Sequence, residues 1–535
     1  MPARQDLSRF ATRYERHYGN RLFRCYVHRP ASIPVMLEQA IAAAPDAEAL
    51  VAAGKRYSYA ELGSAVERMG ANLAALGVQA GDRVAMLLGN SAEFVLTLFA
   101  ALRLGAIAVP LNTREQRSGL AYALNHCTAS VLVYERGLAD RLPAPEVLPN
   151  LRHSFVVGGE DGRGRPFETL LEPTAAALPP VTVQEEDVAA ILYTSGTTGQ
   201  PKGVMLTHLG VVHSAMHFEQ AMGLQRGERV ILTVPASHVT GLVAILLTTV
   251  RVAGCNILMR SFAVDEFLRL AAAERLTYTV MVPAMYNLCL LRADFDAYDL
   301  SAWRIGAYGG APMPVATIAR LREKLPGLRL MNAYGATETT SPTTVMPAEY
   351  TELYPDSIGK VLPCADVRIM NDRGQEVPPG EVGELWIAGP MVAPGYWNDP
   401  EASEKSFVAG YWRSGDAGSI DADGFVRIHD RIKDMIIRGG YNVYSAELEN
   451  VIYNCPGVTE CAVVGQPDPV LGEKIHAIVY SADGSVDAAR IRSFCAERVA
   501  DYKVPDFVTI RLEPLPRNAN GKILKAQLRA QVAGD

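Results

Sequence analysis

The sequence predicts an α/β protein, with a large N-terminal domain of parallel sheets covered by helices and a smaller α+β domain at the C-terminus. Across residues 33–428, helical segments alternate with short apolar runs such as 83–88, 130–134, 229–233 and 278–282. Alternation of this kind gives a mostly parallel sheet with both faces covered. The chain has 535 residues, of which 49% are hydrophobic. A single hydrophobic core rarely serves a chain of more than about 250–300 residues, so we expect at least two domains.

The second half of the chain changes character twice. From 361 to 428, turn sequences such as 421–424 separate short strands, which indicates a β-rich subdomain of hairpins within the large domain. A new alternation of helices and strands then begins. We therefore expect an N-terminal domain at 1–430, a hinge at 431–433 and a C-terminal domain at 434–535.

Charge and cysteine content limit the classes of function. The net charge of −7 and the pI near 5.9 argue against nucleic-acid binding as the main role, because such proteins present a basic surface. The eight cysteines are scattered without a C-x-x-C pair, as expected for reduced thiols in a cytoplasmic protein. The apolar stretch 94–111 is interrupted by Arg103, and 241–250 is about half the roughly 20 residues that a membrane-spanning helix needs. We expect neither a secretory signal nor a transmembrane segment.

Residues 191–204, ILYTSGTTGQPKGV, are the most informative part of the sequence. An apolar strand gives way to hydroxyls and glycines and then to a lysine. Glycines let backbone N–H groups approach an anion, and the hydroxyls and the lysine add donors and charge. The spacing differs from the G-x-x-x-x-G-K-[ST] phosphate loop, which excludes that class. The candidate phosphate-binding residues are Thr194, Ser195, Gly196, Thr197, Thr198 and Lys202.

A second motif, 332–340 or NAYGATETT, combines an aromatic face, a glycine, a hydroxyl and a carboxylate. Upstream, 308–312 or YGGAP has two glycines whose backbone can lie against a flat base. Together with 191–204, these motifs resemble the signatures of the AMP-forming adenylating enzymes. That family includes acyl-CoA synthetases, firefly luciferase and the adenylation domains of peptide synthetases, and the chain is most similar to an acyl-CoA synthetase.

The resemblance covers the chain from about residue 33 and implies roles for individual residues of these motifs. Tyr334 would stack on adenine, Thr337 would meet the α-phosphate, and Glu338 would hold Mg²⁺, which prefers carboxylate and phosphate oxygens. Gly309, Gly310 and Ala311 would form the adenine-side loop, and Gly335 would leave the acyl pocket open for acids larger than acetate.

The same resemblance extends into the last third of the chain. Asp416 and Arg431 match the residues that contact the ribose, with Ser414 in place of the usual threonine. Lys522, on the turn at 516–523, matches the lysine that bridges carboxylate and α-phosphate oxygens. Gly440 matches the loop that faces the active site during thioester formation, which implies that the C-terminal domain is mobile.

Two histidine features remain. His238 matches a gate between the acyl pocket and the thiol channel, and we predict a catalytic role for it together with Lys522, Thr337 and Glu338. His213 and His217 lie one helical turn apart, which is metal-ligand spacing. No H-E-x-x-H motif and no third ligand accompany this pair, so a core position is the favoured interpretation.

The sequence therefore predicts a ligase that joins a medium-chain or aromatic monocarboxylic acid to coenzyme A with ATP and Mg²⁺, through an acyl-adenylate. Segments 238–241, 308–310 and 339–342 contain no Arg or Lys, which argues against a dicarboxylate substrate. The alternatives are a stand-alone adenylation domain that loads a carrier protein, a luciferase-like oxygenase and a nucleotide-binding sensor. A lysine acetyltransferase acting on Lys522 and a homodimer are further partner hypotheses.

Overall fold

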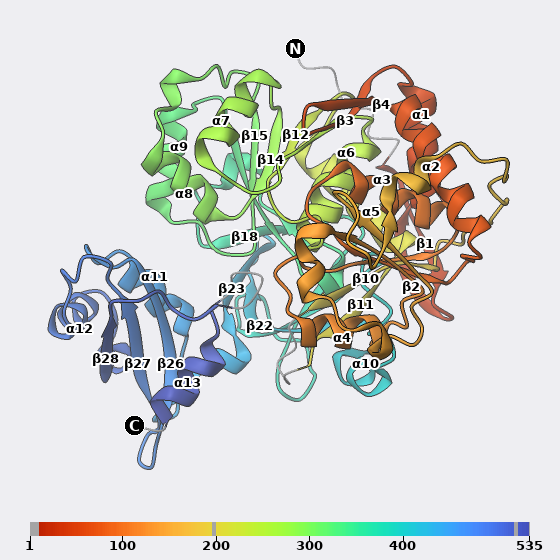
Figure 1. The fold of residues 1–535 in the computed structure, drawn as a ribbon. Coiled ribbons are helices and arrows are strands. Elements are labelled where there is room, and N and C mark those ends of the chain that lie inside the picture. Colours follow the sequence, from red (N-terminus) through yellow and green to blue (C-terminus); the bar gives the residue numbers. More distant parts are fainter. Residues whose placement is uncertain (1–9, 195–199, 518–522, 534–535) are drawn as a thin grey trace. The chain divides into compact units, whose positions relative to one another are not determined.

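The computed structural model describes residues 10–194, 200–517 and 523–533. These residues group into two compact units (Figure 1). The first unit contains Met1–Val367 and Ile387–Arg413, and the second contains Arg368–Trp386 and Ser414–Asp535. The predicted hinge at 431–433 lies within the second unit, and the domain boundary there remains a prediction.

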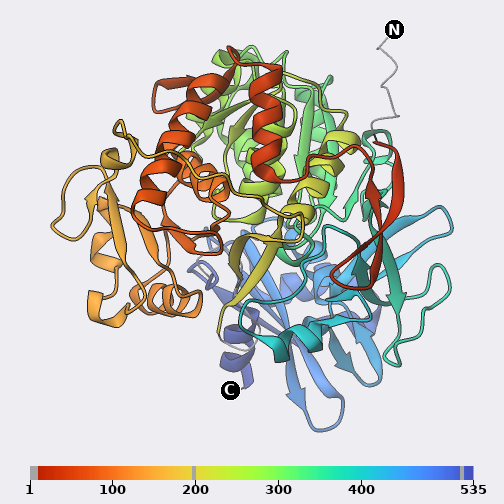
Figure 2. The ribbon, with the colours of Figure 1, turned by 90° about the vertical axis from the view of Figure 1, so that its right-hand side faces the viewer.

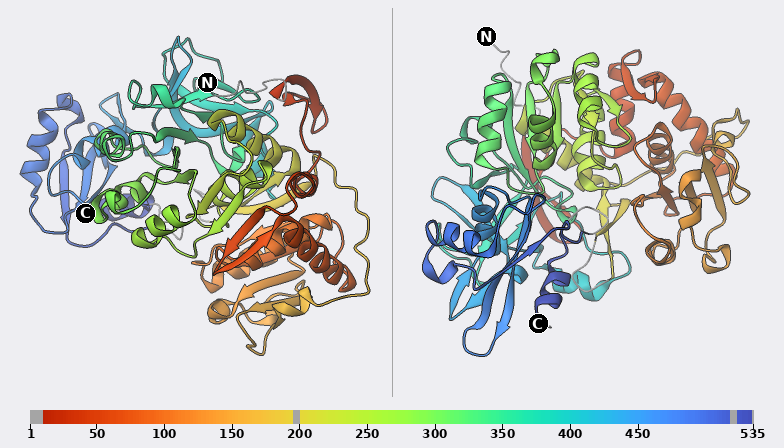
Figure 3. Two further views of the ribbon diagram at one scale, coloured as in Figure 1. Left: turned by 90° about the horizontal axis from the view of Figure 1, so that it is seen from above. Right: turned by 60° about the vertical axis from the view of Figure 1, so that its left-hand side comes forward.

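A seven-stranded sheet in the first unit has the order β11-β10-β6-β5-β7-β8-β9 (Figure 3, orange to yellow). Its strands are β5 (Arg83–Leu87), β6 (Ile107–Pro110), β7 (Val131–Glu135), β8 (His153–Val157), β9 (Arg165–Pro166), β10 (Val188–Thr194) and β11 (Lys202–Thr207). Neighbouring strands are parallel except for β10 and β11, which form an antiparallel pair at the edge. The expected strands at 83–88 and 130–134 are confirmed as β5 and β7.

The larger sheet of the first unit follows the order β18-β17-β16-β15-β14-β12-β13-β3-β4. Its strands are β3 (Glu48–Ala52), β4 (Lys55–Ser58), β12 (Arg229–Leu232), β13 (Cys255–Leu258), β14 (Tyr278–Met281), β15 (Ile305–Tyr308), β16 (Arg329–Tyr334), β17 (Thr344–Val345) and β18 (Ser357–Val361). The strands from β16 to β3 are all parallel. Buried Phe267, Tyr286, Trp303 and Leu321 fill the layer between this sheet and its helices.

Helices connect the strands of the first unit, as expected for parallel sheets. They are α1 (Ile33–Ala43), α2 (Tyr59–Ala75), α3 (Ala92–Arg103), α4 (Arg117–His126), α5 (His208–Met222), α6 (Thr248–Arg251), α7 (Val264–Ala273), α8 (Pro283–Arg292), α9 (Val315–Lys324) and α10 (Pro400–Ser406). The apolar stretch 94–111 forms most of α3 and strand β6. Among the described residues, no helix has the length and apolar character required to cross a bilayer.

The second unit contains hairpins and then a separate C-terminal sheet (Figure 2, blue). Its elements, some of which begin or end in the first unit, are β19 (Asp366–Met370), β20 (Gly383–Ala388), β22 (Tyr411–Ile420), β23 (Phe425–Arg431), β24 (Ile436–Arg438), β25 (Tyr441–Val443), α11 (Ser445–Tyr453), β26 (Glu460–Asp468), β27 (Gly472–Tyr480), α12 (Ala488–Ala496), β28 (Phe507–Arg511) and α13 (Lys525–Ala533). The two-residue strand β21 (Phe407–Val408) belongs to the first unit. Side chains alternate across β26, so Val463 packs with α11 and α12, while Val464 packs with α13 on the opposite face. The predicted β-rich region and the α+β domain are both confirmed.

Three buried histidines fasten α5 to distant parts of the first unit. His208 Nδ1 accepts the backbone N–H of Ile33 at 3.2 Å, and His213 Nε2 accepts that of Tyr26 at 3.2 Å. His217 Nε2 accepts the backbone N–H of Cys364 at 3.4 Å. Each ring therefore acts as a neutral acceptor in the core, and the favoured core interpretation of His213 and His217 agrees with these contacts.

We expect stability to fall between pH 6.5 and pH 5 because these histidines must stay neutral. Burial lowers the pKa of His208 and of His217 to about 3, and lowers that of His213 well below its usual value. A lowered folded-state pKa contributes stability above the unfolded value near 6.5, and this contribution is lost as pH falls toward 3. Each histidine then costs about 1.4 kcal/mol per pH unit.

The measurement is the midpoint of thermal unfolding against pH, for wild type and His217→Gln. Glutamine keeps an acceptor near the Nε2 position but does not titrate, so the variant should lose less stability on acidification. Identical pH slopes for the two proteins would show that His217 does not contribute to this linkage.

Candidate nucleotide and acyl site

The predicted phosphate loop joins the antiparallel strands β10 and β11. Thr194 ends β10 and pairs directly with Lys202, which begins β11. The hydroxyl of Thr194 lies 3.5 Å from the carbonyl oxygen of Lys202. The two ends of the loop are thus held side by side, while Ser195, Gly196, Thr197 and Thr198 lie outside the described residues.

The adenine-side loop and the second motif meet at one edge of the larger sheet. Strand β15 ends at Tyr308 and the parallel strand β16 ends at Tyr334, so Gly309, Gly310 and Ala311 follow one strand while Gly335 follows the other. A Cβ on Gly309 would lie 2.3 Å from the carbonyl oxygen of Ala333, which only glycine avoids. Gly310 has φ +77°, a left-handed conformation that also favours glycine.

Thr337 and Glu338 lie in a short 3₁₀ turn, Thr337–Thr339, directly after β16. Thr337 is buried, whereas Glu338 is partly exposed, and its Oε1 accepts the hydroxyl of Tyr396 at 3.0 Å. A partly exposed carboxylate that is oriented by a neutral donor fits Mg²⁺, which takes one or two carboxylates together with phosphate oxygens. The ion would neutralise phosphate charge at this position.

The predicted ribose-binding pair lies across the β22–β23 hairpin of the second unit. Asp416 is directly opposite Arg431, and Arg431 Nε lies 2.6 Å from Asp416 Oδ1. The Asp416 backbone N–H donates to the Ser414 hydroxyl at 3.0 Å. Serine therefore supplies the hydroxyl that orients this segment. Asp416 is 3% exposed, so its carboxylate is held rigidly by these contacts.

Gly440 lies in a tight turn between β24 and β25. Arg438 pairs with Tyr441 across the turn, so Gly439 and Gly440 are its two central residues, with φ +58° and +85°. Positive φ at both central residues defines a type I′ turn. Tyr441 stacks on Tyr502 with ring centroids 4.6 Å apart, which secures the hairpin within its own unit.

Lys522 lies outside the described residues, but both ends of its loop are described. Arg517 and Ile523 form a β-bridge, and the Leu524 N–H donates to the carbonyl oxygen of Pro516 at 2.9 Å. Directly after the loop, Lys525 at the start of α13 lies 2.6 Å from Glu449 Oε1. The two ends of this loop are therefore held next to each other by backbone pairing.

His238 precedes a buried π-helical segment, Thr240–Leu247. Its ring reaches solvent, yet the surrounding protein lowers its pKa below the usual value by burial. The Thr240 backbone N–H donates to His238 Nδ1 at 3.3 Å. The neutral ring then carries its proton on Nε2 and can donate a hydrogen bond to an oxygen.

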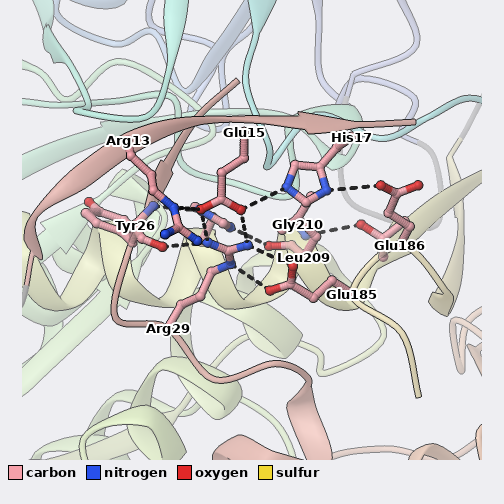
Figure 4. A network of polar contacts seen from close by, with 11 residues as sticks. Arg13, Glu15, His17, Tyr26, Arg29, Glu185, Glu186, Leu209 and Gly210 are labelled. Carbon is pink, nitrogen blue, oxygen red and sulfur yellow. Dashed lines mark hydrogen bonds and ion pairs between the residues drawn. The ribbon is translucent and has the colours of Figure 1, made fainter. Parts of the chain in front are cut away.

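A different group, Glu15, His17 and Cys25, has donor atoms within 4.8 Å of one another. Figure 4 shows the polar contacts of Glu15 and His17. Arg29 contacts both oxygens of Glu15, which lowers the pKa of that carboxyl to about 2. Burial raises the pKa of the Cys25 thiol to about 12. Guanidinium charge beside a protonated thiol does not suit a cation. We interpret this group as an ion-pair network that attaches the hairpin β1 (Thr12–His17) and β2 (Arg21–Tyr26) to Glu185 and Glu186.

Tyr396 is a site residue that sequence reasoning missed. Its hydroxyl reaches Glu338, and its ring lies under the Lys202 ammonium, with Nζ 4.7 Å from the ring centroid. An aromatic residue after the turn residues Pro394 and Gly395 carries no chemical signal of its own. Only the folded structure shows that it contacts both charges.

Sequence profiles place the chain in a known family. The AMP-binding enzyme profile matches residues 37–397, and the profile of the AMP-binding enzyme C-terminal domain matches 447–522. The chain belongs to the AMP-binding enzyme family. Its predicted class, an AMP-forming acid–thiol ligase that uses ATP, Mg²⁺ and coenzyme A, is confirmed.

Relatives and solved structures agree with this assignment. Feruloyl-CoA synthase from Amycolatopsis sp is 37% identical over 91% of this chain and 96% of its own length. The long-chain-fatty-acid–CoA ligase FadD13 from Mycobacterium tuberculosis is 36% identical over 93% and 97%. The structure of o-succinylbenzoate coenzyme A synthetase from Bacillus subtilis with ATP and magnesium ion superposes with a TM-score of 0.82, at 31% identity, covering 93% and 98%.

The surroundings of Gly335 bear on the predicted opening of the acyl pocket, which stays a prediction. A Cβ there would lie 3.1 Å from Ser341 Cα and 3.2 Å from Pro342 Cα. A larger side chain would therefore meet the backbone of the 339–342 turn before it could fill a pocket. The absence of a side chain at Gly335 therefore allows the close packing of this turn.

We predict that Gly335→Ala slows adenylation of small and large acids by the same factor, because the 339–342 turn must shift. The strain of overpacking a tight site is about 1–3 kcal/mol, measured as a lower unfolding midpoint. Gly327→Ala is the matched control, since a Cβ there meets nothing within 4 Å. A slower adenylation of large acids alone would instead support the prediction that Gly335 opens the acyl pocket.

Proposed function

We propose that this enzyme converts a medium-chain or aromatic monocarboxylic acid to its CoA thioester. The observation that carries this proposal is the contact of Tyr396 with both Lys202 and Glu338, because it brings the phosphate-binding lysine and the metal-binding carboxylate to one place. The buried apolar segment Gly241–Leu247, which follows His238 in the sequence, supports an apolar acyl group. The relatives named for feruloyl-CoA and long-chain fatty acids support the same size class.

In the first half-reaction, a carboxylate oxygen of the acid attacks the α-phosphorus of ATP. A bond forms between this oxygen and phosphorus, the bond to the bridging oxygen breaks, and pyrophosphate leaves. Lys202, Lys522 and Thr337 stabilise the charge on the phosphate oxygens, and the acid needs no general base because it is already ionised. Tyr334 holds adenine, while Asp416 and Arg431 hold the ribose.

In the second half-reaction, the CoA thiolate attacks the carbonyl carbon of the acyl-adenylate, and AMP leaves with its oxygen. We propose that the C-terminal domain, 434–535, turns about the hinge at 431–433 between the two steps. This motion would withdraw Lys522 and bring Gly440 toward the thiol. The neutral His238 can donate Nε2–H to an acyl or carboxylate oxygen without adding a positive charge.

A panel of acids tests the substrate proposal. Pyrophosphate release and CoA thioester formation should both be fastest with medium-chain or aromatic monocarboxylates, and slower with acetate and with dicarboxylates. Thioester formation only on a carrier protein would favour the adenylation-domain alternative. Light emission with oxygen and a suitable acid would favour a luciferase-like oxygenase.

Lys522→Ala should slow acyl-adenylate formation by at least about 10²–10³-fold, by analogy with removal of one charge-stabilising donor. Thioester formation from supplied acyl-adenylate should continue, because Lys522 would be withdrawn in that step. Lys405→Ala, which removes an exposed charge on α10, is the control. Equal losses in both half-reactions would contradict the proposed role. Acetylation of Lys522 by a lysine acetyltransferase should reproduce the selective loss, since it also removes the charge.

A further inference from the structure

The segment from Gly389 to Trp397 is held between the two charged parts of the site. On one side, the Ala393 N–H donates to the carbonyl oxygen of Glu338 at 2.8 Å. On the other side, Tyr396 forms a β-bridge with Val204, and the Trp397 N–H donates to the carbonyl oxygen of Gly203 at 2.7 Å. This backbone therefore links strand β11, which begins with Lys202, to the turn that carries Glu338.

The side chain of Tyr396 is buried and held in place by its neighbours. It is 6% exposed, and its ring packs edge-on against Phe407 with centroids 5.4 Å apart. Its backbone N–H donates to the Ser403 hydroxyl at 2.9 Å. Burial and the nearby Glu338 carboxylate raise the pKa of Tyr396. The phenol thus stays protonated and donates to Glu338.

Tyr396 presents a different surface to each charge. The negative face of the ring attracts the Lys202 ammonium, while the hydroxyl donates to the carboxylate of Glu338. Lysine and glutamate side chains both lose rotamer freedom when they are fixed, and a rigid tyrosine can fix both before the nucleotide arrives.

We propose that Tyr396 is a positioning residue that prepares Lys202 for the phosphates and Glu338 for Mg²⁺ during acyl-adenylate formation. This inference rests on the proposed function. Its hydroxyl sets the carboxylate, and its ring sets the ammonium, so the two contacts can be removed one at a time. Neither contact is needed after pyrophosphate has left, and the thioester step should not depend on them.

Tyr396→Phe and Tyr396→Leu test the proposal on the full-length enzyme. Tyr396→Phe keeps the ring and should raise the Mg²⁺ concentration for half-maximal adenylation about tenfold, the effect expected when a hydrogen bond to a charged group is lost. Its KM for ATP at saturating Mg²⁺ should change less than twofold. Tyr396→Leu loses both contacts and should also raise the KM for ATP about fivefold, as expected for loss of a cation–π contact with a partly exposed lysine.

Both variants should form thioester from supplied acyl-adenylate at the wild-type rate, within about twofold. Tyr57 provides a matched control, because Lys55 Nζ lies at the same 4.7 Å from its ring centroid. Tyr57→Phe and Tyr57→Leu should leave the Mg²⁺ and ATP dependences unchanged. Tyr396→Leu removes a buried ring and can impair folding. The result for the nearly isosteric Tyr396→Phe therefore decides the test.

A wild-type Mg²⁺ dependence in Tyr396→Phe would overturn the proposal, and so would equal losses in the two half-reactions, which would indicate a role in packing alone. A wild-type enzyme that forms no acyl-adenylate with any acid would instead overturn the proposed function. The two failures are therefore distinguishable.

Discussion

The close approach of the parallel strands β15 and β16 is the constraint on which the candidate site depends. Parallel strands end at the same edge of a sheet, and ligands of such sheets bind at that edge. The loop after β15 can pass the end of β16 only because Gly309 has no side chain, since a Cβ would lie 2.3 Å from the Ala333 carbonyl oxygen. The adenine-side loop and the turn with Thr337 and Glu338 consequently lie next to each other.

Buried polar groups of the first unit also anchor the strand that begins with Lys202. Strand β11 begins at Lys202 and runs directly into α5, which starts at His208. Three histidines of α5 accept backbone N–H groups from other segments, and each must remain neutral in the core. Anchoring α5 in this way also fixes the direction of β11. The conformational freedom that remains at Lys202 is then mainly that of its own side chain.

The predicted phosphate-binding Lys202 and the predicted catalytic Lys522 share one structural feature, because each belongs to a loop whose two ends are paired. Thr194 pairs with Lys202 at the base of the first loop, and Arg517 bridges Ile523 at the base of the second. Loops carry function well when a rigid scaffold positions their ends. In the first unit, Tyr396 adds a side-chain contact to this support, whereas Lys525 and Glu449 provide it in the second.

The sequence by itself determined the fold class, the strands β5, β7, β12 and β14 and the order of the motifs, because apolar periodicity and turn residues act over a few positions. It also identified Gly309, Thr337 and Glu338 as candidates, since their chemistry is visible in a short motif. Only the tertiary structure decided what His213 and Gly335 contact. It also revealed Tyr396, whose partner Glu338 lies 58 positions away, while His213 meets Tyr26 across 187 positions. Such contacts depend on strand pairing and packing between distant segments, which local sequence patterns do not specify.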